Sequence, residues 1–280
     1  MFNTVGIIGL GLIGGSFALE IKRLKLSENI IGFDEDQKSL DFALKNEIID
    51  GYASLNEIGI CDFVIVATPS DSIASILKTI FSKVKKGTII IDVGSVKNAI
   101  IKQIKEYLPK DICYIPTHPI AGIEKYGIEA SRKDLFKGAY FIITPLENTN
   151  NFSLKKVENF AESLGMKVEK MDAEKHDETF AYISHLPHLI AYALVGMVES
   201  KKEKNFKFIG GGFKDFTRIA SSSEKMWCDI FKLNKDMVIK SVDEFINELN
   251  KVKDFIKNDE EGNMLEYFGN ARGFKESLDV

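Results

Sequence analysis

The chain has 280 residues, which is enough for one large domain or two ordinary ones. Its 45% hydrophobic and 28% charged residues exclude a disordered chain, and a net charge of −4 disfavours general affinity for nucleic acid or an anionic membrane. The three cysteines (Cys61, Cys113 and Cys228) lie far apart, without a disulfide or zinc spacing, so we expect a cytoplasmic protein.

The first half of the sequence alternates strand-like and helix-like segments. Strands are expected at residues 4–9, 29–34, 62–67, 88–92, 113–116 and 140–144. Helices are expected between them at residues 12–25, 36–45, 70–81 and 96–107. Continuous apolar strands separated by helices predict a Rossmann-type, mostly parallel sheet with its functional loops at the carboxyl ends of the strands.

A glycine motif follows the first strand. It has the spacing Gly-x-Gly-x-x-Gly, in which the first glycine allows a tight turn, the second lets a pyrophosphate approach, and the third lets helix and strand pack closely. A purely structural turn is the alternative. The predicted cofactor-binding residues of this loop are Gly9, Leu10, Gly11, Leu12, Ile13 and Gly14.

Asp34 ends the second strand about 20 residues past the glycines, where a ribose-binding carboxylate belongs. Glu35 and Asp36 follow it and no arginine is adjacent, so we expect NAD rather than NADP. Thr68 and Pro69 follow the third strand and are assigned to the same cofactor site.

Two polar residues at later strand ends are candidates for chemistry. His118 precedes Pro119, which excludes a helix there, so we expect a loop histidine beside the cofactor that accepts a proton. A histidine bonded to a backbone carbonyl is the alternative. Ser95 follows Gly94, and its pattern favours a cap for the helix at residues 96–107 over a substrate contact, although both roles can coexist.

Past Pro145 the pattern becomes mostly helical, which predicts a dinucleotide-binding domain at residues 1–149 and a helical domain at residues 150–280. The apolar stretch 186–198 is too short to span a bilayer and predicts a buried helix. A later apolar seam either faces a core or meets a second subunit. The seam consists of Val238, Val242, Phe245, Leu249, Val252 and Ile256.

The remaining histidines do not predict a metal site. His185 and His188 are three residues apart but have no evident third ligand, so we expect a polar pair facing a cleft. His176 lies in a charged run and is expected to be solvated. Arg218 lies between Phe216 and Ile219, which suggests a partly buried guanidinium that binds a carboxylate, or that pairs with Asp215.

These motifs resemble those of the prephenate and arogenate dehydrogenases, the TyrA family, and occur in the family's order. The glycine motif is shared with many dehydrogenases, whereas the combination of the later motifs is more specific. The later motifs are Gly94-Ser95-Val96-Lys97, His118-Pro119-Ile120-Ala121-Gly122 followed by Glu124, Ser184-His185-Leu186-Pro187-His188, and Phe213-Lys214-Asp215-Phe216-Thr217-Arg218.

The resemblance implies NAD-dependent oxidative decarboxylation of prephenate to 4-hydroxyphenylpyruvate in tyrosine biosynthesis, or of arogenate to tyrosine. It implies that His118 accepts the proton of the ring hydroxyl, and that Ser95 bonds this hydroxyl and orients the imidazole of His118. Arg218 would hold a substrate carboxylate, with His188 and Ser184 lining the pocket and Glu124 and Asp215 near its mouth. It also implies a homodimer, with tyrosine as a candidate inhibitor.

No residue distinguishes the two substrates, and prephenate is favoured on family habit and the expected NAD preference. Two other classes stay open. One is another dehydrogenase of the β-hydroxyacid type, which would use a lysine base on the helical part. The other is a non-enzymatic NAD-sensing module, in which His118 and Arg218 would have no catalytic use.

Overall fold

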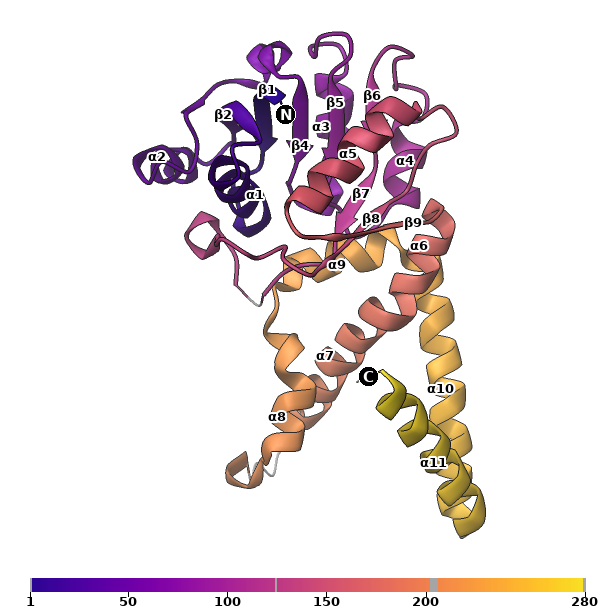
Figure 1. Cartoon of the computed structure of the whole chain (residues 1–280). Helices are drawn as coiled ribbons and strands as arrows, with labels where there is room; N and C mark the ends of the chain where they lie inside the picture. Colours follow the sequence, from indigo (N-terminus) through magenta and orange to yellow (C-terminus); the bar gives the residue numbers. More distant parts are fainter. Residues whose placement is uncertain (1, 124, 202–205, 279–280) are drawn as a thin grey trace. The chain divides into compact units, whose positions relative to one another are not determined.

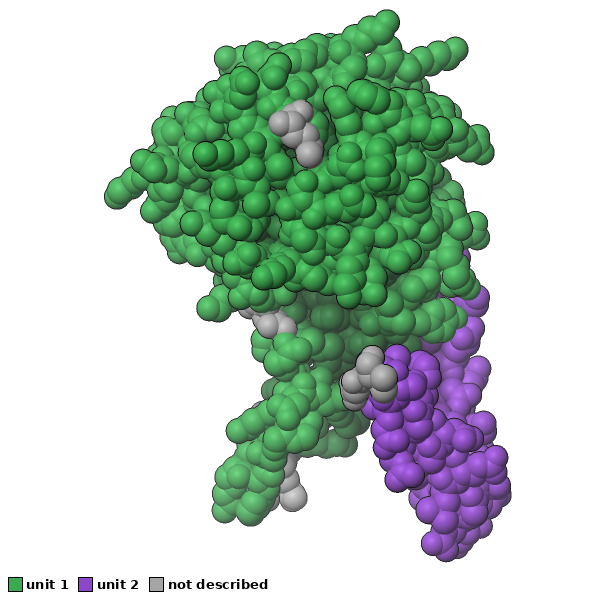
Figure 2. Space-filling model, in the orientation of Figure 1, with its two compact units in different colours: residues 1–235 green, residues 236–280 purple. Residues whose placement is uncertain are grey.

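The chain folds into two compact units, Met1–Lys235 and Asp236–Val280 (Figure 2). The computed structural model describes residues 2–123, 125–201 and 206–278. The expected domain boundary between residues 149 and 150 stays a prediction.

A six-stranded parallel sheet forms the centre of the first unit. Its order confirms the Rossmann-type prediction, because the chain starts at an inner strand and builds outward in both directions. In spatial order the strands are β3 (Gly51–Tyr52), β2 (Ser27–Phe33), β1 (Phe2–Ile8), β4 (Phe63–Val66), β5 (Ile89–Asp92) and β6 (Cys113–Ile115).

Helices cover both faces of this sheet because alternate residues of each strand point to opposite sides (Figure 1). Phe63 and Ile65 of β4 join the core that contains α1 and α5, whereas Val64 and Val66 join the core of α3 and α4. The helices are α1 (Leu12–Arg23), α2 (Gln37–Lys45), α3 (Ser70–Ile80), α4 (Asn98–Ile104) and α5 (Asn151–Ser163).

A second, three-stranded sheet contains β7 (Thr117–Pro119), β8 (Tyr140–Ile143) and β9 (Lys167–Lys170). The expectation that residues 140–144 extend the parallel sheet is therefore wrong, and so is the loop expected at His118. The chain passes through Pro116 directly into β7 and returns antiparallel in β8. Between them the described residues form only a short 3-10 turn (Ile128–Ala130), not the helix that a parallel crossover needs.

The helical part of the first unit contains one long continuous helix, composed of α6 (Ala173–Phe180), a π-helical turn (Ala181–His185) and α7 (Leu186–Glu199). By length and composition alone this run could cross a membrane, which is weak evidence, since core helices pass the same test. The expectation of a buried helix at residues 186–198 is wrong. Only Leu186 and Ala191 of α7 are buried within this chain.

Shorter helices complete the first unit, and two long helices form the second. The shorter ones are α8 (Gly211–Thr217), α9 (Glu224–Leu233) and 3-10 turns at Leu55–Ile60, Phe206–Phe208 and Arg218–Ser221. The second unit comprises α10 (Lys235–Lys257) and α11 (Glu261–Ser277), joined by a hydrogen bond of 2.9 Å from the Tyr267 hydroxyl to Glu248. Within the predicted seam on α10, Leu249 and Ile256 are more than half exposed.

A fully buried ion pair fixes the ends of the central strands. The Lys97 ammonium contacts Asp92 at the end of β5 and donates a hydrogen bond of 2.6 Å to the carbonyl of Thr117 in β7. The Tyr114 hydroxyl donates to the same carboxylate at 2.7 Å. Removing one partner would leave an uncompensated charge in the interior, which is much more costly than removing both.

Lys97→Met is therefore expected to lower the free energy of unfolding by about 3–5 kcal/mol in denaturant titration. The double variant Asp92→Leu/Lys97→Met should lose less than the sum of the two single variants, because neither charge is then left alone. Arg272 forms an exposed ion pair with Glu276, and Arg272→Met should leave the unfolding midpoint nearly unchanged. A loss below about 1 kcal/mol in Lys97→Met would contradict this account.

Candidate active site

The carboxyl ends of β1, β4 and β5 meet at one edge of the sheet. Ile8 pairs with Val66, and Val66 pairs with Asp92, so the loops after these three strands begin side by side. The order reverses between β1 and β4, because β2 and β3 extend to one side and β5 and β6 to the other. Open sheets of this kind bind ligands at such a switch point.

The glycine loop after β1 has the geometry that the motif predicts. Gly9 adopts φ +90, and a Cβ there would lie 2.6 Å from the carbonyl oxygen of Ala67. A Cβ on Gly14 would lie 2.0 Å from the carbonyl oxygen of Gly9, so helix α1 packs directly on the turn. A Cβ on Gly11 would meet open space, and no side chain caps α1 at Gly11. The first turn of α1 therefore offers backbone N–H groups to an anion.

Asp34, directly after β2, is hydrogen-bonded to this loop. Its carboxylate accepts hydrogen bonds from the backbone N–H groups of Leu10 at 2.6 Å and Asp36 at 2.9 Å. Asp36 instead caps α2, accepting from the N–H groups of Lys38 and Ser39, and its bond to the Ser39 hydroxyl lowers the pKa of its carboxyl. Of these two acids, Asp34 is therefore the one that contacts the glycine loop.

Thr68 lies against the glycine loop from the end of β4. A Cβ on Gly9 would come within 2.9 Å of its methyl carbon. The Thr68 hydroxyl is buried and has no hydrogen-bond partner among the residues that the structure describes. An unpaired buried hydroxyl next to an open glycine loop fits a bound polar ligand such as a dinucleotide. Pro69 is exposed and precedes the first residue of α3.

His118 is linked to two residues of α6. Its Nδ1 lies 2.9 Å from Nε2 of His176, and Nδ1 of His176 lies 2.8 Å from the carboxylate of Asp177. His176 is fully buried, so the expectation that it is solvated is wrong. Its ring also packs against Phe180 one helical turn later, 4.5 Å between centroids. Burial lowers the pKa of His118 well below its usual value, and His176, Lys97 and His185 lower it further.

The expected capping role of Ser95 is also wrong. Helix α4 begins at Asn98, and the Asp177 carboxylate accepts hydrogen bonds of 2.8 Å from the backbone N–H groups of Lys97 and Asn98. A side chain distant in sequence therefore caps α4. The half-buried Ser95 hydroxyl is left outside the cap and lies in the segment between Asp92 and Lys97.

A second group of polar residues continues from Asp177 into α7 and α9. Asn234 donates a hydrogen bond of 2.8 Å to the Asp177 carbonyl and lies 3.1 Å from Nδ1 of His185. His188 stacks on Trp227 with 3.7 Å between ring centroids, and its Nδ1 lies 2.9 Å from the Ser184 carbonyl. Among the described residues, no group of three or more potential ligands could hold a metal ion.

Other predicted substrate residues are not brought to this group in the single chain. Arg218 and Asp215 are exposed, so the expectation of a partly buried Arg218 is wrong for the chain by itself. Their helix, α8, has only Thr217 buried. Glu124 lies outside the residues that the structure describes.

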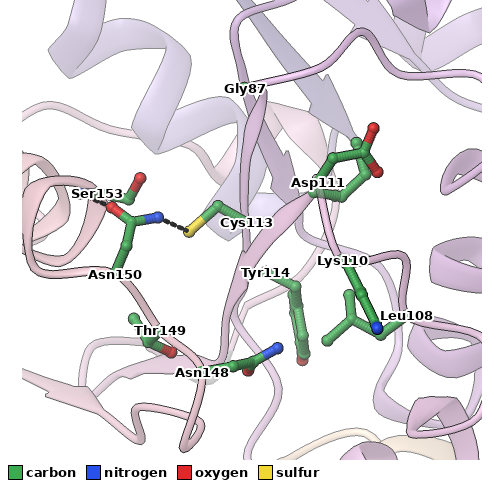
Figure 3. Close-up of a pocket in the computed structure, with 11 residues that line it drawn as sticks. Gly87, Leu108, Lys110, Asp111, Cys113, Tyr114, Asn148, Thr149, Asn150 and Ser153 are labelled. Carbon is green, nitrogen blue, oxygen red and sulfur yellow. Dashed lines mark hydrogen bonds between the residues drawn. The ribbon is translucent and has the colours of Figure 1, made fainter.

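A separate hollow lies at the amino ends of β5 and β6 (Figure 3). It is lined by Cys113, Asn150 and Ser153 among others, and the Asn150 amide lies 3.6 Å from the Cys113 sulfur. Burial raises the pKa of the Cys113 thiol. None of the predicted site residues lines this hollow, which lies at the edge of the sheet opposite the glycine loop.

Comparison with known proteins identifies a family. A family model described as the prephenate dehydrogenase nucleotide-binding domain matches residues 17–170, and one described as the prephenate dehydrogenase dimerization domain matches residues 172–270. Prephenate dehydrogenase of Bacillus subtilis is 34% identical, over 99% of this chain and 76% of the relative. Cyclohexadienyl dehydrogenase of Zymomonas mobilis is 32% identical, over 96% of this chain and 93% of the relative.

A solved structure agrees with these matches. The crystal structure of prephenate dehydrogenase from Aquifex aeolicus, in complex with hydroxyphenyl propionate and NAD+, superimposes with a TM-score of 0.94 at 35% identity. The match covers 99% of each chain. The matched models, the sequence identities and the shared fold agree, and the chain belongs to the prephenate dehydrogenase family.

Proposed function

We propose that this enzyme catalyses the NAD-dependent oxidative decarboxylation of prephenate to 4-hydroxyphenylpyruvate. The proposal rests on two features at one edge of the sheet. His118 is a neutral histidine that contacts the buried His176, and the glycine loop after β1 is open to a dinucleotide. The Aquifex aeolicus relative was solved with NAD+ and a hydroxyphenyl ligand, which supports both the cofactor and the substrate class.

The proposed reaction needs one base that takes and then returns a proton. His118 removes the proton of the ring hydroxyl, and the hydride on the same carbon leaves. NAD, when bound, supplies the acceptor for this hydride. The ring carboxylate then departs as CO2, its bonding electrons make the ring aromatic, and His118 returns its proton to the ring oxygen. Positioning and general-base catalysis therefore account for the protein's part.

The proposed roles of the other residues follow their places in the fold. Ser95, on the loop after β5, bonds the ring hydroxyl beside His118, and the cofactor is held by the glycine loop residues Gly9 to Gly14 with Asp34, Thr68 and Pro69. His188 and Ser184 line the substrate pocket. Arg218 binds a substrate carboxylate, with Asp215 and Glu124 at the pocket mouth.

Arogenate is the alternative substrate. Prephenate carries a ketone on its side chain where arogenate carries an ammonium. No described residue of this site distinguishes the two substrates. The relative from Zymomonas mobilis is named a cyclohexadienyl dehydrogenase, which keeps arogenate in consideration. We favour prephenate because the expected cofactor is NAD and the Bacillus subtilis relative is named a prephenate dehydrogenase.

We also propose a homodimer. Helix α7 exposes Ile183 just before it and Val195 and Met197 along it, and the second unit exposes Leu249 and Ile256. Exposed apolar surface of this extent favours covering by another subunit, and the matched family model for residues 172–270 is described as a dimerization domain. A cytoplasmic location and inhibition by tyrosine complete the proposal.

Replacing the base tests the reaction directly. His118→Asn is expected to lower kcat by about 10²- to 10⁴-fold while the Kd for NAD, measured by calorimetry, stays within about twofold. Because the His118 pKa is lowered, the wild-type kcat/KM should stay constant as pH falls to 6.5 and decline only below it. Full turnover in the variant would mean that a different residue is the base.

Cofactor choice is tested at Asp34. The variant Asp34→Asn/Glu35→Arg keeps an oxygen for the Leu10 N–H but replaces negative charge with positive charge, so the preference for NADP over NAD should rise at least about tenfold. Asp36→Asn, which alters only the cap of α2, is the matched control and should not change the preference. A wild-type enzyme that already prefers NADP would contradict the assignment of Asp34.

A further inference from the structure

We propose that His176 and Asp177 are positioning residues, which fix the ring tautomer of His118 and stabilise its protonated form during the reaction. This inference rests on the proposed function, in which His118 is the base. It deepens that function by assigning roles to two buried residues of α6 that the predicted site did not include.

The hydrogen bonds of Asp177 determine which ring nitrogens of His176 and His118 carry a hydrogen. The Asp177 carboxylate accepts from two backbone N–H groups, of Lys97 and Asn98, and from a ring nitrogen of His176. Both Asp177 oxygens already accept from backbone N–H groups, so the carboxylate is the acceptor and Nδ1 of His176 carries the hydrogen. Burial lowers the pKa of His176, so its ring is neutral and its Nε2 must accept. The hydrogen between the two rings therefore belongs to Nδ1 of His118.

This arrangement leaves the second ring nitrogen, Nε2, as the basic atom of His118. When Nε2 takes the substrate proton, the ring becomes a cation whose Nδ1–H points at His176. Only Nε2 gains a proton, and the hydrogens on the other ring nitrogens keep their places. The negative charge of Asp177 then acts through the polarised His176 ring, whereas in a Ser-His-Asp triad the buried aspartate bonds the base histidine directly.

Other charged groups around His118 oppose its protonation. A charged His176, Lys97 on the segment before α4 and His185 at the end of the π-helical turn all lower the His118 pKa, so only a neutral His176 ring can stabilise a cation on His118. Asp92 is already bonded to Lys97, Tyr114 and Gly94, so its charge is largely compensated. Asp177 is therefore the acid that reaches His118 through a hydrogen-bonded neighbour.

Asp177 also joins the two parts of the proposed catalytic site. The carboxylate that orients His176 caps α4 through Lys97 and Asn98, directly after the segment that carries Ser95. One side chain thus positions both the base and the strand-end serine. A variant at this position should affect kcat far more than the binding of either ligand.

The test compares two replacements of His176. His176→Leu removes the acceptor for His118, whereas the side-chain oxygen of His176→Gln can still accept. We expect kcat to fall about 100-fold or more in His176→Leu and to recover at least tenfold in His176→Gln, with both KM values within about twofold of wild type. Equal kcat values for the two variants, or a fall below about threefold in His176→Leu, would overturn the proposal.

Asp177→Asn supplies a second readout, and Asp172→Asn is its matched control. Asp172 caps the same helix α6 and is exposed. Its carboxylate accepts from the Lys175 N–H and contacts neither histidine, and the backbone carbonyl that accepts from the His176 N–H is unchanged in the variant. In Asp177→Asn the acidic limb of the kcat/KM profile should move to lower pH, because the cation on His118 loses its negative partner. In Asp172→Asn only the Tm should fall. An unmoved acidic limb in Asp177→Asn would mean a purely structural role and would overturn the proposal.

Nitrogen-15 NMR of the histidine rings separates this proposal from the proposed function. Wild-type protein should show His118 with hydrogen on Nδ1, that state should persist in His176→Gln, and it should be lost in His176→Leu. This readout needs no substrate. If the enzyme oxidised neither prephenate nor arogenate, the proposed function would fail while the tautomer result still stood. Hydrogen on Nε2 of His118 in the wild type would overturn the positioning role.

Discussion

The Asp177 carboxylate accepts hydrogen bonds from His176 and from the backbone of Lys97 and Asn98, 80 and 79 residues earlier in the chain. Through these bonds it joins the first turn of α4 to α6, and its own carbonyl accepts from Asn234 beyond α9. The elements that carry Ser95, His118 and His188 are thereby connected through one acidic residue. The geometry of the proposed site depends on this carboxylate staying buried and keeping these hydrogen bonds.

Burial, assisted by the charge of Lys97, lowers the pKa of the histidines at this sheet edge. Burial is the largest cause of the lowered pKa of all four histidines, and for His185 it gives a pKa of about 4. The buried Lys97 adds to this effect at His118 and His176. A neutral imidazole can accept a proton. Burial of these polar groups costs folding free energy, but it also keeps His118 neutral and available as a base at neutral pH.

Local patterns predicted the nucleotide-binding half well, because apolar strand runs and glycine spacing reflect backbone requirements that act within a few residues. β3 was missed, since two residues carry no periodic signal. His176 was misjudged because Glu174 and Lys175 are exposed, whereas His176 and Phe180 share the buried helix face. Their spacing of four residues was the available signal. Ser95 was predicted to cap the helix that follows it, but Asp177, far away in sequence, caps α4 instead.

The exposure of Arg218 and of α7 could not be predicted from the sequence, because apolar composition does not say which surface covers a helix. The expected burial assumed a core within one chain. The structure of the single chain leaves these surfaces open, and the proposed homodimer accounts for them.

The proposed reaction is tested by assaying the purified enzyme with prephenate and with arogenate, each with NAD and with NADP, while following NADH or NADPH, CO2 and the aromatic product. We expect prephenate with NAD to give the highest kcat/KM, with equal amounts of NADH, CO2 and 4-hydroxyphenylpyruvate. Reduction of the cofactor without release of CO2, or turnover of arogenate alone, would contradict it.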